Sequence, residues 1–231
     1  MKKSNVDSVI QKLKSMANSK ELAGMARYGM SLTNRLGISM WEIRKIAKEI
    51  ESDHQLAVEL WRTGYQEARM LASFIDIPAE VTEGQMEEWA AEFDTWDVCD
   101  QVSTGLFEQT RFTKKKIKEW AKRDEEYVKR SAFAIIAGQA VHDKTSNDEV
   151  FENYFPLIKK AATDERNYVK KAVSWALRNI GKRNSSLNSA VLKFANDLKT
   201  SESKSARWIA NDTIKDITSD ATKRKFERKK N

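Results

Sequence analysis

Apolar residues recur at helical spacing along most of this chain. Near the beginning, Val6, Val9, Ile10 and Leu13 follow the three- and four-residue steps that place side chains on one face of a helix. Few helix-breaking residues interrupt such patterns, because the 231 residues include only two prolines and eight glycines. The sequence therefore predicts an all-α protein.

Polar residues mark the expected beginnings of individual helices. Ser39 is followed three residues later by Glu42, which is the pattern of a capping box and predicts a helix over 41–50. Thr82 and Gln85 form a second such pattern ahead of another apolar series. The remaining sequence predicts a glycine-containing loop over 24–39, helices over 54–63 and 65–75, and a basic helix over 113–121.

Two segments in the second half of the chain resemble each other. Residues 124–133 are similar to residues 164–173, and Tyr127 and Tyr168 are 41 residues apart. A period near 40 built from helix pairs is typical of HEAT-like repeats, which stack into a solenoid with a concave face. We therefore predict that residues 1–231 form one domain, a right-handed superhelical solenoid of HEAT-like (ARM-type) repeats.

A basic residue occupies one position of the repeat, both in these two copies and in a weaker echo over 67–72. If that position lines the concave face, the solenoid presents a basic groove; otherwise these are ordinary charges on helix surfaces. The residues concerned are Arg69, Arg130 and Lys171.

Positive charge is concentrated in the second part of the chain. Residues 1–100 contain 12 Lys and Arg against 17 Asp and Glu, whereas residues 101–231 contain 29 against 17. Such a bias indicates a polyanionic partner, most simply nucleic acid, although part of it lies in the basic C-terminal segment 220–231. The alternative is a solvated surface with a basic tail.

Cysteine and histidine, the usual ligands of zinc, are scarce. Cys99 is the only cysteine, which excludes a disulfide within the chain and suits a reducing cytoplasm. The two histidines, His54 and His142, lack the spacing of a zinc motif, so we expect no metal site. The beginning of the chain lacks the apolar run of a signal peptide, and no segment is apolar enough to span a membrane, so we expect a cytoplasmic protein.

Trp96 and Asp100 form the pair of residues best suited to chemistry. In a helix they lie four residues apart on one face, while Val98 and Val102 share a neighbouring face that can anchor the helix to a core. An indole beside a carboxylate can hold a cation, and the carboxylate can stabilise that charge or activate a water molecule. The alternative is that Trp96 is a core residue and that the aspartates near the helix start act as caps.

Five short motifs occur in order over roughly residues 20–180. They are Met25-Ala26-Arg27-Tyr28, Leu36-Gly37-Ile38, Trp96 with Asp100, Tyr127-Val128-Lys129-Arg130, and Lys171-Ala172-Val173-Ser174-Trp175-Ala176-Leu177-Arg178. Together they resemble the motifs of the AlkD-type bacterial DNA alkylation repair glycosylases. The resemblance implies a solenoid of HEAT-like repeats that binds duplex DNA and hydrolyses the N-glycosidic bond of N3- and N7-alkylated purines without needing a base pocket. We also expect a monomer.

The resemblance further implies roles for individual residues. Trp96 packs against the deoxyribose, and Asp100 stabilises the developing cation and positions or deprotonates the attacking water. By the same resemblance, Arg130 would bind a nearby phosphate, Trp175 would pack against the sugar-phosphate from the other side, and Tyr28 would form part of the wall of the site. Such an enzyme needs no metal or cofactor, which fits the absence of metal-ligand clusters and glycine-rich phosphate loops. The residues expected to bind DNA are thus Tyr28, Arg69, Arg130, Lys171 and Trp175.

Three positions depart from the pattern of that family. The chain has Ser39 where the family has a glutamine near the site, Trp41 where it has a proline, and Thr95 where its best-known pattern has a second tryptophan. The family also includes divergent members with weak or undetected activity. Two alternatives therefore stay open: a non-catalytic DNA-binding protein of the same fold, and a protein-interaction scaffold, which is the commonest use of helical repeats.

Overall fold

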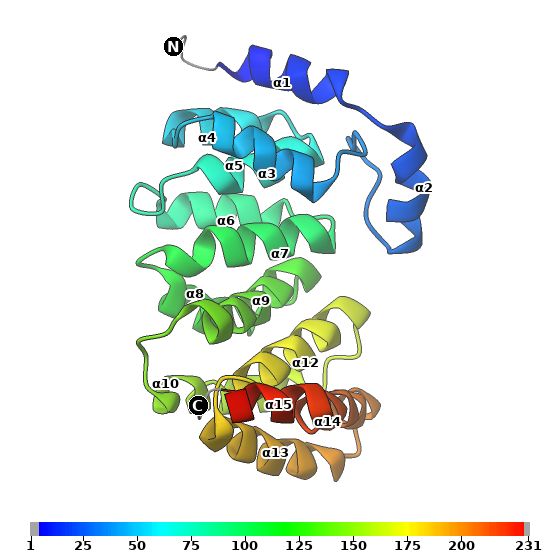
Figure 1. Cartoon of the computed structure of the whole chain (residues 1–231), viewed down its shortest axis with the longest axis vertical. Helices are drawn as coiled ribbons and strands as arrows, with labels where there is room; N and C mark the ends of the chain where they lie inside the picture. Colours follow the sequence, from blue (N-terminus) through cyan, green and yellow to red (C-terminus); the bar gives the residue numbers. More distant parts are fainter. Residues whose placement is uncertain (1–4, 229–231) are drawn as a thin grey trace. The chain divides into compact units, whose positions relative to one another are not determined.

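The structure is a computed structural model that describes residues 5–228. Every regular element in that range is helical, which confirms the prediction of an all-α chain, and the chain divides into two compact units after Thr113 (Figure 1). The prediction of a single domain over residues 1–231 stays a prediction. The first unit contains α1 (Val6–Ser15), α2 (Ser19–Arg27), α3 (Met40–Glu49), α4 (His54–Arg62), α5 (Gln66–Ile75), α6 (Glu83–Ala91), α7 (Trp96–Gly105) and the 3-10 helix η1 (Phe107–Gln109). The chain continues with α8 (Thr113–Trp120), α9 (Glu126–His142), α10 (Asp148–Glu152), α11 (Phe155–Ala161), α12 (Asn167–Gly181), α13 (Ser185–Lys199), α14 (Lys204–Ile217) and α15 (Asp220–Arg228).

Side chains at the predicted positions begin α3 and α6. Ser39 Oγ accepts a hydrogen bond from the Glu42 amide nitrogen, and the Glu42 carboxylate accepts one from the Ser39 amide nitrogen at 3.0 Å, so the capping box of α3 is confirmed. The Thr82 hydroxyl accepts a bond from the Gln85 amide nitrogen at 3.1 Å. The Gln85 side chain, however, donates to Asp76 Oδ2 at 2.7 Å, so it serves a buried polar contact.

The predicted loop over 24–39 is wrong at its beginning. Residues 24–27 belong to α2, which Asn18 caps by accepting a hydrogen bond from the Lys20 amide nitrogen at 3.1 Å. Gly24 is an ordinary helical residue, since no atom lies within 4 Å of the position that a Cβ would take. The observed loop therefore spans only the residues between Arg27 and Met40.

One buried carboxylate of α5 holds this loop. Glu67 is 1% exposed and accepts hydrogen bonds from the backbone nitrogens of Leu36, Gly37 and Ile38, the one from Gly37 measuring 2.8 Å. Gly37 has a φ of +79°, and a Cβ there would lie 2.2 Å from the carbonyl oxygen of Asn18. The loop therefore requires glycine at position 37 and a hydrogen-bond acceptor at position 67.

Aromatic stacking joins two helices of the first unit. The ring of Trp61 in α4 stacks on that of Trp89 in α6, with a centroid distance of 4.1 Å and an interplanar angle of 2°. Both side chains are buried, and Trp61 Nε1 donates to the Glu92 carboxylate at 3.2 Å. The indoles thus combine a large buried apolar area with a satisfied polar atom.

The repeat seen in the sequence corresponds to contacts between α9 and α12 in the second unit. The rings of Tyr127 and Tyr168 lie 5.5 Å apart, and Arg130 Nη1 donates to the Tyr168 carbonyl oxygen at 2.6 Å. Lys129 Nζ pairs with Asp164 at 3.1 Å. The residues that the two copies share are therefore those that pack one copy against the next.

Candidate functional site

Trp96 and Asp100 lie one turn apart on α7 and line one cavity of the first unit. The cavity has a volume of about 320 Å³, and both side chains are partly exposed in it. Val98 and Val102 are buried, as predicted, and fix the opposite side of the helix to the core. The pair therefore combines a rigid support with access from solvent.

Three aspartates surround Trp96 in the sequence, and the structure separates their roles. Asp94 accepts hydrogen bonds from the Gln66 side chain, the shorter at 3.0 Å. Asp97 binds the Arg35 guanidinium through both oxygens, at 2.7 and 3.0 Å. Asp97 and Asp100 both line the cavity, whereas Asp94 does not.

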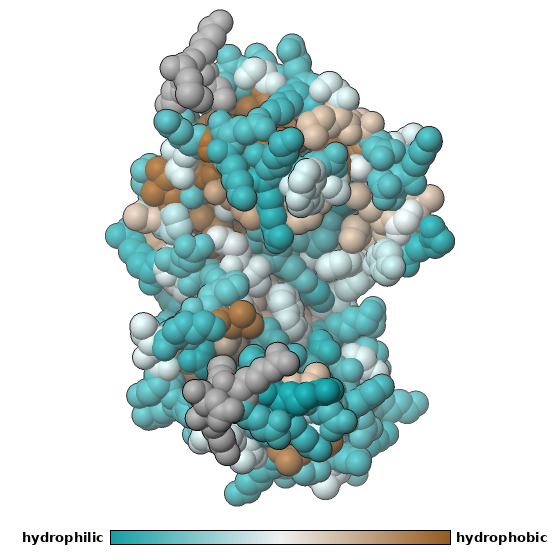
Figure 2. All heavy atoms as spheres, viewed as in Figure 1, coloured by the Kyte–Doolittle hydropathy of each residue, from teal (hydrophilic) through white to brown (hydrophobic). Residues whose placement is uncertain are grey.

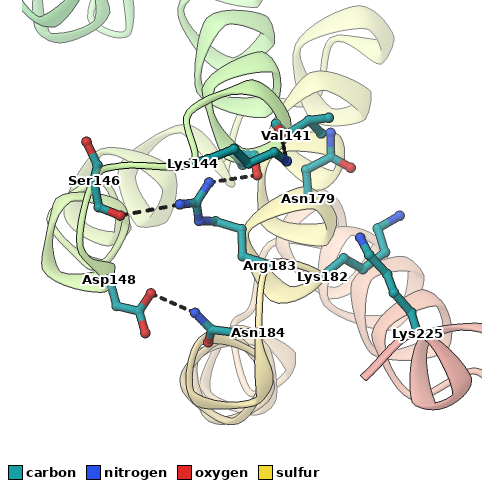
Figure 3. A pocket seen from close by; sticks show the side chains of 10 residues that line it. Val141, Lys144, Ser146, Asp148, Asn179, Lys182, Arg183, Asn184 and Lys225 are labelled. Carbon is teal, nitrogen blue, oxygen red and sulfur yellow. Dashed lines mark hydrogen bonds between the residues drawn. The ribbon is translucent and has the colours of Figure 1, made fainter. Parts of the chain in front are cut away.

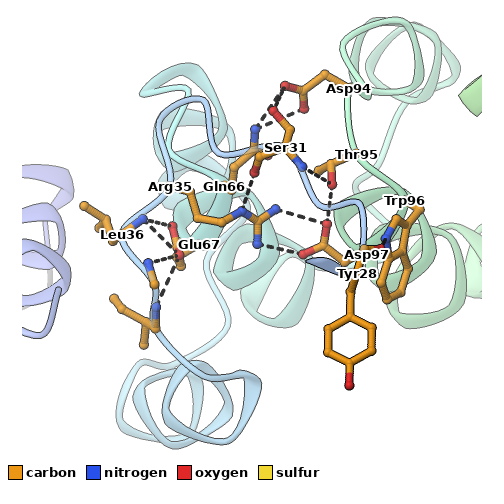
Figure 4. Close-up of polar contacts among 12 residues, drawn as sticks. Tyr28, Ser31, Arg35, Leu36, Gln66, Glu67, Asp94, Thr95, Trp96 and Asp97 are labelled. Carbon is orange, nitrogen blue, oxygen red and sulfur yellow. Dashed lines mark hydrogen bonds and ion pairs between the residues drawn. The ribbon is translucent and has the colours of Figure 1, made fainter. Parts of the chain in front are cut away.

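The backbone of the loop after α2 positions the indole of Trp96. Trp96 Nε1 donates to the Tyr28 carbonyl oxygen at 3.0 Å (Figure 4). The Tyr28 side chain is 76% exposed, and its ring points away from the polar network in Figure 4. Tyr28 thus contributes its carbonyl group to the site and presents its ring to solvent.

A buried ion pair ties the same loop to the start of α7. The Arg35 side chain is 2% exposed; besides Asp97, its Nε donates to the Ser31 carbonyl oxygen at 2.7 Å. Thr95 Oγ1 accepts a bond from the Ser31 amide nitrogen at 3.1 Å and donates to Asp97 at 2.5 Å. These bonds fix the helix start that carries Trp96, because removing any partner would leave a buried polar group unpaired.

Thioether side chains form much of the cavity wall, which the sequence did not indicate. Met25, Met30, Met40 and Met70 line it, and Arg44 of α3 is a further lining residue. Sulfur is polarisable and adapts to irregular surfaces, so such a wall can follow the shape of an apolar or cationic group. No spacing rule connects these residues, since α2, the following loop, α3 and α5 each contribute.

Arg69, predicted to bind DNA, has partners within the first unit. Its guanidinium forms an ion pair with Glu92 and lies over the Trp61 ring, 4.8 Å from the centroid. The side chain is 12% exposed. The role of Arg69 in DNA binding stays a prediction, and its observed contacts support the packing of α4, α5 and α6.

The other predicted DNA-binding residues lie in the second unit. Lys171 and Trp175 are four residues apart on α12 and share one face; Lys171 is exposed and Trp175 partly exposed. Arg130 is 6% exposed, with its guanidinium bonded to the Tyr168 carbonyl group and 5.9 Å from the centroid of that ring. The structure thus places Tyr28, Trp96, Asp100 and Arg69 in the first unit and Arg130, Lys171 and Trp175 in the second.

The three departures from the resembled pattern have separate structural roles. Ser39 caps α3, as described above. Trp41 is 72% exposed, with Lys45 Nζ 5.9 Å from its ring centroid. Thr95 is fully buried and bonded to the network of Asp97. A threonine at position 95 therefore supports the start of α7 and offers no second aromatic surface.

The described part of the chain contains neither a metal-binding cluster nor a helix suited to cross a membrane. Among residues 5–228, no group of three or more His, Cys, Asp or Glu side chains is placed to hold a metal ion. Within the same range no helix has the length and apolar character needed to cross a membrane.

The fold and the cavity define a helical-repeat protein with a supported aromatic–carboxylate pair. The family model described as DNA alkylation repair enzyme matches residues 9–217, so the chain belongs to that family. No curated protein matches the chain significantly in sequence.

Solved structures show the same fold. One of them, with a TM-score of 0.74 and 16% identity, covers 84% of this chain and 83% of its own; it is described as belonging to a new family of proteins related to the HEAT-like repeat DNA glycosylases with affinity for branched DNA structures. This likeness confirms the predicted HEAT-like repeat fold. An engineered protein (TM-score 0.41, 16% identity, 76% of this chain and 84% of that one) and a designed armadillo repeat protein in complex with a (KR)4 peptide (0.36, 17%, 80% and 79%) are less similar.

Proposed function

We propose that this protein is a monofunctional DNA glycosylase that releases N3- and N7-alkylated purines from duplex DNA. Membership in the DNA alkylation repair enzyme family supports the substrate class. The observation that carries the proposal is that Trp96 and Asp100 line the same cavity, one helical turn apart and on a helix whose start is fixed by buried polar contacts.

The alkylated purine is a good leaving group. Alkylation makes the purine cationic, so when its bond to C1′ of the deoxyribose breaks, the electron pair stays on the base and the base departs neutral. Positive charge then develops on the sugar. The π face of Trp96 and the carboxylate of Asp100 are both suited to stabilise that charge.

Asp100 also supplies a base for the attacking water. As the water oxygen bonds to C1′, its proton passes to the carboxylate, which releases it to solvent after the product leaves. General-base assistance of this kind contributes about 10²–10⁴-fold to a rate. Trp96 is held in place by its bond to the Tyr28 carbonyl group, so the ring does not have to be ordered during the reaction.

The remaining contacts to DNA belong to the same proposal. Lys171 and Arg130 neutralise phosphates, Trp175 packs against sugar-phosphate, and Tyr28 presents its exposed ring to the duplex. Arg69 belongs to the proposed DNA-binding residues, and it would have to exchange its ion pair with Glu92 for one with a phosphate. The protein acts as a monomer and uses no cofactor.

Base release from methylated duplex DNA tests the proposal. We expect the wild-type protein to release 3-methyladenine and 7-methylguanine, and Trp96→Ala to lower the rate at least tenfold through loss of the aromatic surface. Trp96→Phe keeps a ring but loses the N–H bond to Tyr28, so its rate should lie between those two. Glu88→Gln is a matched control, because Glu88 is exposed on α6 and lines no part of the cavity. Equal rates in all variants would contradict the assignment of Trp96.

A second candidate function is non-catalytic binding of DNA. Two observations favour it: Thr95 offers no second aromatic surface, and the similar structure at TM-score 0.74 is described as having affinity for branched DNA structures. In that case the wild-type protein binds DNA with a steep dependence on salt but releases no base. A comparison of binding to duplex and four-way junction DNA, beside the release assay, separates the two candidates.

A further inference from the structure

The second unit contains a basic cavity at the ends of α9 and α12, separate from the residues discussed so far. Its volume is about 480 Å³, within the range of roughly 300–1,000 Å³ that holds small ligands. Four cationic side chains line it against a single carboxylate (Figure 3). The cations are Lys144, Lys182, Arg183 and Lys225, and the carboxylate is Asp148.

Arg183 and Lys144 offset the negative end of α9 at this cavity. Arg183 Nη1 donates to the carbonyl oxygens of Ala140 and Asp143 at 3.0 and 2.6 Å, and Lys144 Nζ donates to that of Val141. Carbonyl groups at a helix C-terminus would otherwise repel an anion. Because Arg183 and Lys144 compensate these carbonyl groups, the C-terminal end of α9 does not repel a nearby anion.

The cavity floor is also fixed by amide side chains. Asn179 Nδ2 donates to the Ala137 carbonyl oxygen at 3.0 Å, and Asn184 Nδ2 donates to Asp148 at 2.8 Å. The bond from Asn184 occupies the single lining carboxylate and lowers its repulsion toward an anion. The floor is therefore built from side chains with defined partners, which suits a binding site more than a chance hollow.

Lys182 and Lys225 both line the cavity, and Figure 3 shows their side chains. Lys182 Nζ pairs with Asp216 at 2.8 Å, but Asp216 also lies 3.7 Å from Arg178 Nε. One carboxylate is thus shared by two cations. Arg178 Nε also lies 3.6 Å from Asp212, so these two cations face two carboxylates, and a phosphate has to displace Asp216 from Lys182 in order to bind there.

We propose that this cavity binds a phosphodiester group of the DNA backbone. The proposal rests on the proposed function only in taking duplex DNA as the partner. Lysine ammonium groups bind phosphate as point charges, and Figure 2 shows a mainly hydrophilic surface on the second unit.

The course of α12 supports DNA over a free anion as the source of the phosphate. Lys171, Trp175, Arg178 and Lys182 follow one another at steps of four, three and four residues, so they share one face of the helix. This row is about 16 Å long at 1.5 Å per residue. A DNA strand that contacts Lys171 and Trp175 can therefore run along α12 to the cavity at the C-terminal end of that helix.

Salt-dependent binding by a charge-removing variant tests the proposal. We would measure the Kd of Lys182→Gln/Lys225→Gln for a fluorescent unmodified duplex by anisotropy at several NaCl concentrations. Loss of one phosphate contact should weaken binding about tenfold near 0.1 M salt and reduce the slope of log K against log salt by about one. Lys182→Arg/Lys225→Arg keeps both charges and should retain most of the affinity.

A matched control removes equal charge elsewhere in the same unit. Lys193 and Lys199 are exposed on α13 and line no part of the cavity, so Lys193→Gln/Lys199→Gln should leave the slope unchanged. Equal weakening in both double variants would overturn the proposal in favour of a general charge effect. Thermal melting of each variant shows that the fold is kept.

The outcomes separate this inference from the proposed function. If the wild-type protein binds duplex DNA and the cavity variant binds it equally well, the cavity inference is wrong and the proposed function stands. Protection of the wild-type protein from thermal unfolding by millimolar inorganic phosphate, with DNA affinity unchanged in the variant, would assign the cavity to a free anion and overturn a phosphodiester. A wild-type protein without affinity for duplex DNA would overturn both.

Discussion

At the scale of single residues, Glu67 holds the loop between α2 and α3 in its conformation. It is buried and accepts hydrogen bonds from three successive backbone nitrogens. Glu67→Gln would turn one acceptor oxygen into a donor that faces N–H groups. We expect the free energy of unfolding to fall by about 1–3 kcal/mol, as for other buried groups left without a partner.

Denaturant unfolding measures this loss, and Glu51→Gln provides the control. Glu51 is exposed, so its substitution should change stability by less than about 0.5 kcal/mol. Identical unfolding curves for the two variants would contradict the role assigned to Glu67.

Asp164 lies between successive repeats, and its carboxyl group makes the stability of the folded protein depend on pH. Hydrogen bonds from Arg166, with a further one from Lys129, lower the pKa of the Asp164 carboxyl to about 2. In the unfolded chain the pKa is about 3.9, so the folded state gains stability from the ionised form above that pH and loses it as the pH falls toward 2. Allowing for solvent screening at this partly exposed carboxyl, the contribution is about 1 kcal/mol.

The pH dependence of unfolding tests this ion pair. Between pH 5 and pH 2.5 the wild-type protein should lose about 1 kcal/mol more stability than Asp164→Asn, which has no carboxyl to titrate. Parallel pH curves for the two proteins would show that the ion pair contributes nothing measurable.

At the scale of elements, the loop between α2 and α3 decides how the site is held. Gly37→Ala would combine a φ of +79° with a Cβ 2.2 Å from the Asn18 carbonyl oxygen. We expect a loss of at least about 2 kcal/mol and slower base release, because the loop carries the carbonyl group that holds Trp96. Gly24→Ala is the contrasting variant: it lies within α2 with open space around it and should stabilise the protein by about 0.5–1 kcal/mol. Thermal unfolding of the pair measures both effects, and equal shifts would contradict this account of the loop.

The elements also show what the sequence could predict. Ser39 with Glu42 identified the start of α3 because a capping box is a local pattern of two residues. Gly24 led to a wrong prediction, since a glycine marks a possible break without requiring one, and the Asn18 cap upstream decides that α2 forms. The spacing of Trp96 and Asp100 was equally local. In contrast, which aspartate near Trp96 pairs with Arg35 depends on a contact across 62 positions of sequence that no periodicity reveals.

At the scale of the whole molecule, repetition was the most informative feature of the sequence. Tyr127 and Tyr168 are similar in context because each packs against the neighbouring copy, so the repeat reports a contact as well as a motif. The cavity beside Trp96 could not be predicted in this way, since its methionines come from several elements of the first unit. The family match over residues 9–217 agrees with the resemblance found in five short motifs.

The charge distribution supports the proposed DNA partner. The basic excess after residue 100 and the basic cavity of the second unit both favour duplex DNA as the partner, whereas the aromatic–carboxylate pair lies in the first unit. In the proposed enzyme, binding and chemistry are therefore assigned to different residues and can be separated by substitution.

The central claim is that Asp100 performs the chemistry, and the single-turnover rate of 3-methyladenine release from methylated duplex tests it most directly. We expect Asp100→Asn to lower this rate by about 10²–10⁴-fold while its Kd for the same duplex stays within about threefold of the wild-type value. The exposed-carboxylate control, Glu88→Gln, should match the wild-type protein in both. A wild-type rate in Asp100→Asn would contradict the account.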